Sequence, residues 1–149
     1  MKSRILFLLL FILTSCGYQP LYSKKEVKIL TIKELEFIGD ANINKKIASA
    51  LPIKFDKTIL LKNKIILENK KTVIETSKNK KGQPDSYKMI IDFKFSFIDN
   101  DNILNEKFIS EEFSYKNKDN KFDLSQYEMN IEQSLINKII EKLIIYMNV

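Results

Sequence analysis

The clearest structural signal in the chain is the stretch from Tyr87 to Ile98, which reads YKMIIDFKFSFI. Large apolar side chains occupy every second position. Because successive side chains of a strand point to opposite faces, this alternation predicts a long strand with one face on a core and a mixed face toward water or a partner. The core face is expected to hold Tyr87, Met89, Ile91, Phe93, Phe95 and Phe97.

The segments on either side of this strand predict antiparallel neighbours. Asp99-Asn100-Asp101-Asn102 has the composition of a hairpin turn, and residues 103–115 return as a strand. Its shared face is expected to hold Ile103, Ile109, Phe113 and Tyr115. Upstream, β-branched residues in 64–77 predict a strand that residues 68–71 interrupt as a bulge or inner turn, followed by a turn at 79–85.

Two helices and a first strand complete the predicted elements. Residues 27–37 have strand-like alternation. Asp40 can cap a short helix over 41–51, which Pro52 ends. A last helix of about 25 residues is expected after Asp123 as N-cap, with Gln126 in a capping box and Phe122 and Tyr127 as a hydrophobic staple. Its apolar stripe predicts core packing, with a partner groove as the alternative.

The element order β-α-β-β-β-α predicts an α+β fold. We expect a two-layer sandwich, with a four-stranded, mostly antiparallel sheet and two helices on one face. The expected division of the chain is a signal peptide over 1–15, a lipidated N-terminus and tether over 16–25, and one domain over 26–149.

Composition excludes most catalytic classes. With 149 residues, 44% hydrophobic and 30% charged, the chain matches one ordinary globular domain. It has no His and one Cys, which removes Ser-His-Asp and Cys-His catalysis, zinc sites and internal disulfides. Arg4 is the sole arginine, so a sequence-specific nucleic-acid reader is not expected. We expect a protein that is not an enzyme and holds no metal or cofactor.

The N-terminus has the features of an export signal. Lys2 and Arg4 precede nine apolar residues, 5–13, which would span only about 13 Å of helix and are too short to cross a bilayer. Leu13-Thr14-Ser15-Cys16 resembles the lipobox of bacterial lipoproteins, which implies cleavage before Cys16 and covalent lipid on it. Loss of Lys2 and Arg4 lowers the net charge from +6 to about +4. The alternative is a buried free cysteine after an ordinary leader.

A longer resemblance follows the cysteine. Residues 16–22, Cys-Gly-Tyr-Gln-Pro-Leu-Tyr, resemble the Cys-Gly-Phe-Arg-Pro-Leu-Tyr start of alphaproteobacterial LPS-assembly lipoproteins, the LptE family. Residues 113–117, Phe-Ser-Tyr-Lys-Asn, are similar to the Ser-Tyr-Asn segment that closes that family's last strand. Gln19 stands where the family usually has Arg.

The resemblance implies a non-enzymatic outer-membrane lipoprotein. Family members lie at the periplasmic face of the outer membrane, plug the β-barrel LptD and help to deliver lipopolysaccharide to the outer leaflet. The implied partners are therefore LptD, lipopolysaccharide and the membrane lipid that holds the anchor. Gly17 after the cysteine fits outer-membrane sorting, by the same family rule.

Lysines at the predicted turns are the candidate ligands for lipid A phosphates. They form two groups, one of Lys70, Lys71, Lys78, Lys80 and Lys81 and one of Lys116, Lys118 and Lys121. We favour Lys78, Lys80 and Lys81, because a hairpin tip can reach a head group. The alternative is that all are solvated loop lysines.

Other readings are weaker or stay open. Asp92, Glu111 and Glu112 are expected as exposed strand charges, and Asp99–Asn102 lacks the later ligands of a calcium loop. A freestanding envelope lipoprotein that binds lipid, or a pilot lipoprotein for another outer-membrane complex, remains an alternative function.

Overall fold

The computed structural model describes residues 29–58 and 63–147 and has an α+β fold. Its elements follow in chain order: β1 (Leu30–Ile32), β2 (Glu34–Ile38), α2 (Ala41–Ala50), β3 (Ile53–Phe55), β4 (Asn63–Lys78), β5 (Pro84–Asp99), β6 (Asn102–Lys116) and α3 (Lys121–Met147).

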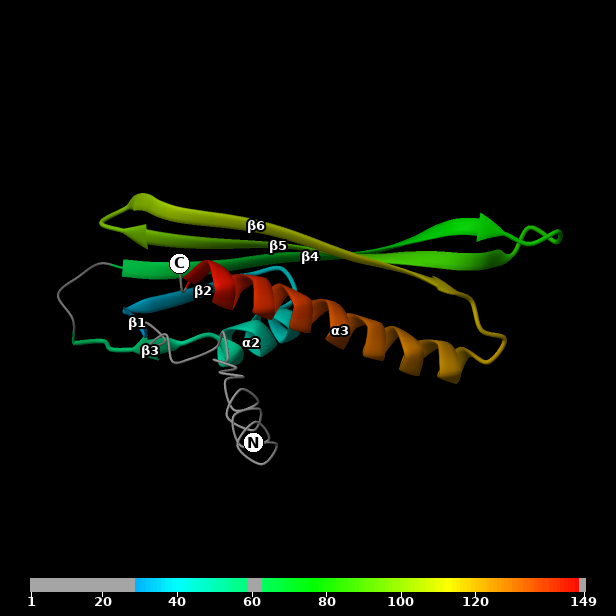
Figure 1. Cartoon of the computed structure of the whole chain (residues 1–149), viewed down its shortest axis with the longest axis horizontal. Helices are drawn as coiled ribbons and strands as arrows, with labels where there is room; N and C mark the ends of the chain where they lie inside the picture. Colours follow the sequence, from blue (N-terminus) through cyan, green and yellow to red (C-terminus); the bar gives the residue numbers. More distant parts are fainter. Residues whose placement is uncertain (1–28, 59–62, 148–149) are drawn as a thin grey trace, which may run out of the picture.

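The main sheet has the strand order β2-β4-β5-β6. Strand β2 is parallel to β4, whereas the β4–β5 and β5–β6 pairs are antiparallel. Both helices lie on one side of this sheet, and no described helix covers the other side, which we call the open face (Figure 1). The predicted fold class is confirmed. A small parallel sheet of β1 and β3 is an addition that was not predicted.

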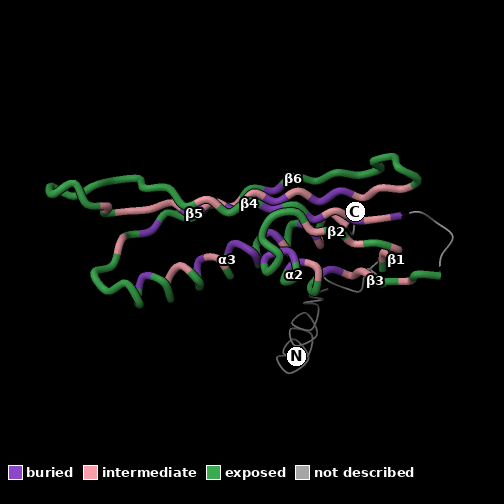
Figure 2. The backbone as a smooth tube through the Cα atoms, turned by 180° about the vertical axis from the view of Figure 1, so that it is seen from behind, coloured by how far each residue is buried: buried purple, intermediate pink, exposed green. Residues whose placement is uncertain are grey.

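The core lies between the sheet and the two helices. The alternation of β5 is confirmed, because Met89, Ile91, Phe93 and Phe95 are buried on the helix side. Tyr87 and Phe97 pack against this core with partial exposure. Buried positions concentrate in the half of the sheet that α2 also covers, whereas the outer part of the β4–β5 hairpin is exposed (Figure 2).

Helix α3 supplies one wall of the core along much of its length. Its buried side chains are Leu124, Ile131, Leu135, Ile136, Ile139 and Leu143. Tyr127, Ile140, Ile144 and Tyr146 are partly buried and widen the stripe. The apolar stripe therefore packs on the sheet and is not left as a partner groove.

The predicted start of this helix is wrong by about one turn. Asn120 Oδ1 accepts a hydrogen bond from the Phe122 N–H at 2.9 Å, and the Asn120 carbonyl accepts one from the Leu124 N–H at 3.0 Å. Asn120 is therefore the cap, because asparagine satisfies the free N–H groups of a first turn. Asp123 lies inside the first turn, where its charge suits the helix dipole, and Phe122 is exposed rather than stapled.

The predicted first strand is two strands in two sheets. Strand β1 pairs with β3, and β2 pairs with β4, with the change of sheet at Lys33. The buried side chain of Asn63 holds this junction: it accepts from the Lys33 N–H at 3.0 Å and donates to the Thr31 carbonyl at 2.9 Å. This contact joins residues about 30 positions apart, so local alternation could not reveal it.

Helix α2 confirms the predicted short helix, and a second asparagine holds its entrance. Asp40 caps it by accepting from the Asn42 and Ile43 N–H groups at 2.8 and 3.3 Å. The buried Asn69 accepts from the Asp40 N–H at 3.3 Å and donates to the Asp40 carbonyl at 2.9 Å. Gly39, the residue before this cap, adopts φ +91°.

Strand β4 runs without the interruption expected at residues 68–71. Its pairing with β5 is regular from Asn63 to Glu75, and the register shifts only between Glu75 and Lys78. Each polar residue of this run has a suitable environment. Glu68 and Lys70 lie on the open face. Asn69 bonds Asp40, and Lys71 donates to Glu132 of α3 at 2.7 Å.

The turn between β5 and β6 is confirmed, and one residue of β6 faces the other way than predicted. Asn100 and Asp101 have φ of 47° and 65°, as a two-residue hairpin turn requires. A register shift next to Phe97 places Ile103 opposite Ile98. Side chains directly opposite share a face, so Ile103 lies on the open face, away from the buried Ile109 and Tyr115.

Candidate functional site

The β4–β5 hairpin passes beyond α3 at one end of the sheet, which we call the distal end (Figure 1). The lysines predicted as ligands lie in this hairpin. Lys78 is the last residue of β4, and Lys80 and Lys81 lie in the turn. Asn79 Oδ1 accepts from the N–H groups of Lys81 and Gln83 at 2.9 and 3.0 Å. Gly82, with φ +78°, completes a defined turn that presents both lysines to solvent.

The three predicted lysines differ in their partners. Lys78 Nζ lies 3.7 Å from a carboxylate oxygen of Glu75, three residues earlier in the same strand. Across residues 29–58 and 63–147, Lys80 and Lys81 have no carboxylate within 4 Å. The turn lysines are therefore the two that are available to an external anion.

The second lysine group joins the same end of the molecule. The Asn117 N–H donates to the Asp85 carbonyl at 2.8 Å, and its Nδ2 donates to the Pro84 carbonyl at 2.8 Å. These bonds fasten the end of β6 to the start of β5, so Lys116 and Lys118 lie beside the first residues of β5, close to the hairpin turn. Lys70 and Lys71 do not join them, because Lys71 lies at mid-sheet, bound to Glu132 of α3.

A tyrosine cluster supports this end of the sandwich, and sequence reasoning did not assemble it. The Tyr115 ring stacks on Tyr87 at 5.6 Å and meets Tyr127 edge to face at 6.0 Å. Tyr115 also donates to Glu128 at 2.6 Å. Burial, and then this hydrogen bond, raise the pKa of Tyr115 above its ordinary value. The only feature of the sequence that could have indicated this cluster is that β5 and β6 each carry a tyrosine on the face predicted to be buried.

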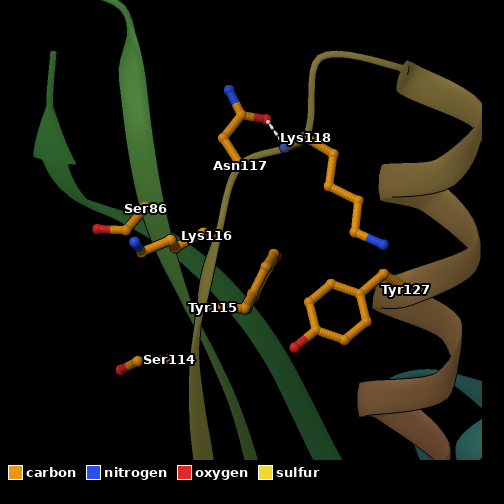
Figure 3. Close-up of a pocket in the computed structure, with 7 residues that line it drawn as sticks. All are labelled: Ser86, Ser114, Tyr115, Lys116, Asn117, Lys118 and Tyr127. Atoms are coloured by element: carbon orange, nitrogen blue, oxygen red, sulfur yellow. Dashed lines mark hydrogen bonds between the residues drawn. The ribbon is translucent and has the colours of Figure 1, made fainter.

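An open hollow of about 570 Å³ lies around the end of β6. Figure 3 shows Tyr115, Tyr127 and Lys118 on the helix side of β6, with Ser86, Ser114 and Lys116 on its other side. Lys118 Nζ lies 4.5 Å from the centre of the Tyr127 ring. No carboxylate lines this hollow, so its polar groups can meet an anion. A second hollow, of about 410 Å³, includes Lys121 but also Asp85 and Asp119.

The carboxylates considered in the sequence do not form a catalytic pair. Asp92 accepts from the Ser110 hydroxyl at 2.6 Å, and Glu112 binds Lys88 at 3.0 Å, both on the open face. Glu111 lies on the helix side and binds Lys142. Within residues 29–58 and 63–147, no cluster of three or more Asp, Glu, His or Cys side chains is placed to hold a metal ion.

Cys16, the expected lipid attachment site, and the tether lie outside the described residues. Among the described helices, none combines the length and apolarity needed to cross a bilayer.

Comparison with known proteins finds similarity of fold alone. No family model and no curated protein matches the sequence. The rare lipoprotein B of Shewanella oneidensis superposes with a TM-score of 0.58 at 11% identity, over 77% of this chain and 93% of that one. A minor lipoprotein of Acinetobacter baumannii gives 0.58 at 12% identity, over 80% and 91%. Lipoprotein B of Nitrosomonas europaea gives 0.51 at 9%, over 85% and 88%. The chain therefore has the fold of these lipoproteins.

Proposed function

We propose that this chain is an LptE-type lipoprotein of the outer membrane, which plugs an LptD-type β-barrel and assists the delivery of lipopolysaccharide. The observation that carries the proposal is a fold shared with rare lipoprotein B over nearly the whole of that protein. The lipobox at Cys16 and the family-like segment 16–22 support it as separate observations, because they are read from the sequence and not from the fold. In this role the protein performs no covalent chemistry.

The open face suits a polar barrel lumen. Three of its lysines have cross-strand carboxylate partners: Lys64 lies 3.0 Å from Glu36, Lys88 3.0 Å from Glu112, and Lys94 2.8 Å from Glu106. The hydrogen bond from Lys94 is the main cause that holds the pKa of Glu106 below its ordinary value. Such a surface stays hydrated without a large net charge, which fits the polar interior of an outer-membrane barrel.

The decisive experiment is an affinity pull-down of the lipidated protein from detergent-solubilised outer membranes, with mass identification of the retained proteins. The proposal expects an LptD-type barrel in about equal amount, because a plug and its barrel form a one-to-one complex. Recovery of a secretion pore would favour the pilot alternative. Recovery of the protein alone would favour the freestanding alternative, although the hollow beside Tyr127 is open to solvent rather than enclosed.

The turn lysines are proposed to contact lipid A phosphates. The double variant Lys80→Glu with Lys81→Glu is expected to weaken lipopolysaccharide binding by about tenfold or more, because two unpaired cations become anions. The fold should be unchanged, since both side chains are exposed. A binding titration measures the effect.

A matched control places the same charge change at the other end of the molecule. Lys54 and Lys57 are exposed, and within the described part of the chain neither has a carboxylate within 4 Å. Lys54→Glu with Lys57→Glu should leave the affinity near that of the wild type. Equal losses in both double variants would point to net charge alone and remove Lys80 and Lys81 from the site.

A further inference from the structure

Among the residues that the structure describes, strand β4 has no partner along its outer edge over its distal half. Strand β2 pairs with β4 only from Lys64 to Glu68, after which the chain turns at Gly39 into α2. Beyond that point β4 continues to Lys78, paired with β5 on one side. Figure 1 shows no described element beside its other side. We call the outer side of residues 71–75 the free edge of β4.

The direction of the backbone groups at this edge follows from two contacts. The Asn63 carbonyl accepts from the Lys33 N–H at 3.2 Å, so it points toward β2. The Asn69 carbonyl also points that way, since a Cβ placed on Gly39 would lie 2.0 Å from it. The strand is regular from Asn63 to Glu75 and its groups alternate in direction. The N–H and C=O groups of Lys71, Val73 and Glu75 therefore point outward.

The middle of this edge, between Lys71 and Glu75, carries no charged side chain that would block another strand. Thr72, Val73 and Ile74 are three consecutive uncharged, β-branched residues, and Val73 and Ile74 are 44% and 43% exposed. Natural edge strands are usually blunted by charges, prolines or bulges. Here the bulge comes only after Glu75. The edge thus offers six aligned backbone groups and an apolar side chain on each face of the sheet.

The outer edge of β6, in contrast, carries many charged side chains. Because the Asn117 N–H points to β5, the groups of residues 106, 108, 110, 112 and 114 point outward by the same alternation. Charged side chains follow one another along it, including Glu106, Lys107, Glu111 and Glu112. The Tyr146 hydroxyl also donates to the Glu106 carbonyl at 3.4 Å. This edge is therefore protected, and it serves as the comparison.

We propose that an extended segment of the barrel partner adds as a strand to the free edge of β4 and bonds the backbones of Lys71, Val73 and Glu75. This inference rests on the proposed function and names its contact. Only an extended backbone can match three N–H and three C=O groups in register. The segment should carry β-branched or aromatic residues opposite Val73 and lack proline there, because cross-strand apolar pairs stabilise such an addition.

Amide hydrogen exchange, resolved by residue, tests the pairing directly. In the isolated lipidated protein, the amides of Lys71, Val73 and Glu75 are expected to exchange fast, while those of Lys70, Thr72 and Ile74 are slowed by bonds to β5. In the purified complex with the barrel, the three outward amides should slow by about tenfold or more. Unchanged exchange in that complex would overturn the proposal. Slow exchange already in the isolated protein would also overturn it, because a second copy or the protein's own chain would then occupy the edge.

A proline pair tests the same contact by another measurement. Val73→Pro removes an outward N–H without removing a bond to β5, and Ser110→Pro makes the matching change on the edge of β6. The amount of barrel retained in the pull-down should fall by about tenfold or more for Val73→Pro and stay near wild type for Ser110→Pro, with circular dichroism as the check of folding. Retention by both folded variants would overturn the proposal. If Val73→Pro does not fold, the exchange measurement on the wild type decides.

The two proposals fail in different ways. If the wild type retains the barrel but the free edge stays unprotected, only the strand addition is wrong. If the wild type retains no barrel, the proposed function is wrong and the strand addition falls with it.

Discussion

The substitution Gly39→Ala is expected to lower the free energy of unfolding by about 3 kcal/mol. Gly39 has φ +91°, a conformation that L side chains rarely adopt. A Cβ there would also lie 2.0 Å from the Asn69 carbonyl oxygen, far inside van der Waals contact with backbone that cannot turn away. The turn must open, and the hydrogen bonds that join Asp40 to Asn69 should weaken with it. Urea unfolding measures the loss.

Gly82→Ala is the matched control for this effect. Gly82 has a similar φ of +78°, but nothing lies within 4 Å of a Cβ placed there. The Gly82→Ala substitution should lower the free energy of unfolding by about 1 kcal/mol, which is the conformational cost alone. If the two variants lose the same stability, the close approach of Gly39 to β4 does not contribute, and the turn is less tightly packed than the structure indicates.

The substitution Phe93→Ala is expected to lower the free energy of unfolding by about 4 kcal/mol, since truncation of a buried aromatic loses its transfer free energy and leaves a cavity. Phe93 is fully buried at the centre of β5, between Asn69 of β4 and Ile109 of β6. Partial collapse of the site can reduce the cost, but β5 is the middle strand of three, so β4 and β6 hold the backbone on both sides of Phe93 in place. Urea or thermal unfolding gives the value.

Phe108→Ala provides the comparison on the neighbouring strand. Phe108 belongs to the open face and is 63% exposed, so its truncation removes little buried area and should cost less than about 1 kcal/mol. A large loss at Phe108, or a small one at Phe93, would mean that the buried layer lies on the other side of the sheet.

Local patterns in the sequence predicted the elements whose stabilising contacts lie within one segment or one pair of neighbours. The alternation at residues 87–98 predicted a strand with its buried face, because the period of two is a property of the strand itself. The positive φ values of Asn100 and Asp101 occur where turn composition predicted a hairpin. The stripe of α3 likewise predicted its buried side chains.

Predictions failed where a distant residue decided the local structure. Residues 27–37 were expected as one strand, but Asn63 bonds both Thr31 and Lys33 and separates two strands. The polar run at residues 68–71 was expected to break β4, but partners on Asp40 and α3 accommodate it. The cap of α3 was misplaced because two capping residues lie three positions apart and sequence preference alone does not choose between them.

In the candidate site, too, one part was predictable from local sequence and another part was not. The lysines at 78, 80 and 81 were expected at a hairpin tip, and Asn79 and Gly82 place them there by local turn chemistry. The convergence of this tip with Lys118 and the tyrosines could not be read from the sequence, because it depends on Asn117 fastening β6 to β5.

Local sequence patterns were sufficient to predict the α+β class, the antiparallel hairpins, and the faces of β5 and α3. These follow from period, turn composition and the order of charged and apolar residues, which act over a few neighbouring positions. The point at which β2 ends and leaves β4 without a neighbour, and the choice of lysines that lack a partner, could be seen only in the folded arrangement of residues 29–58 and 63–147. Those features depend on contacts such as Asn69 with Asp40 and Lys71 with Glu132, which join residues 29 and 61 positions apart. Such contacts become favourable only once the chain has folded, so no local pattern encodes them.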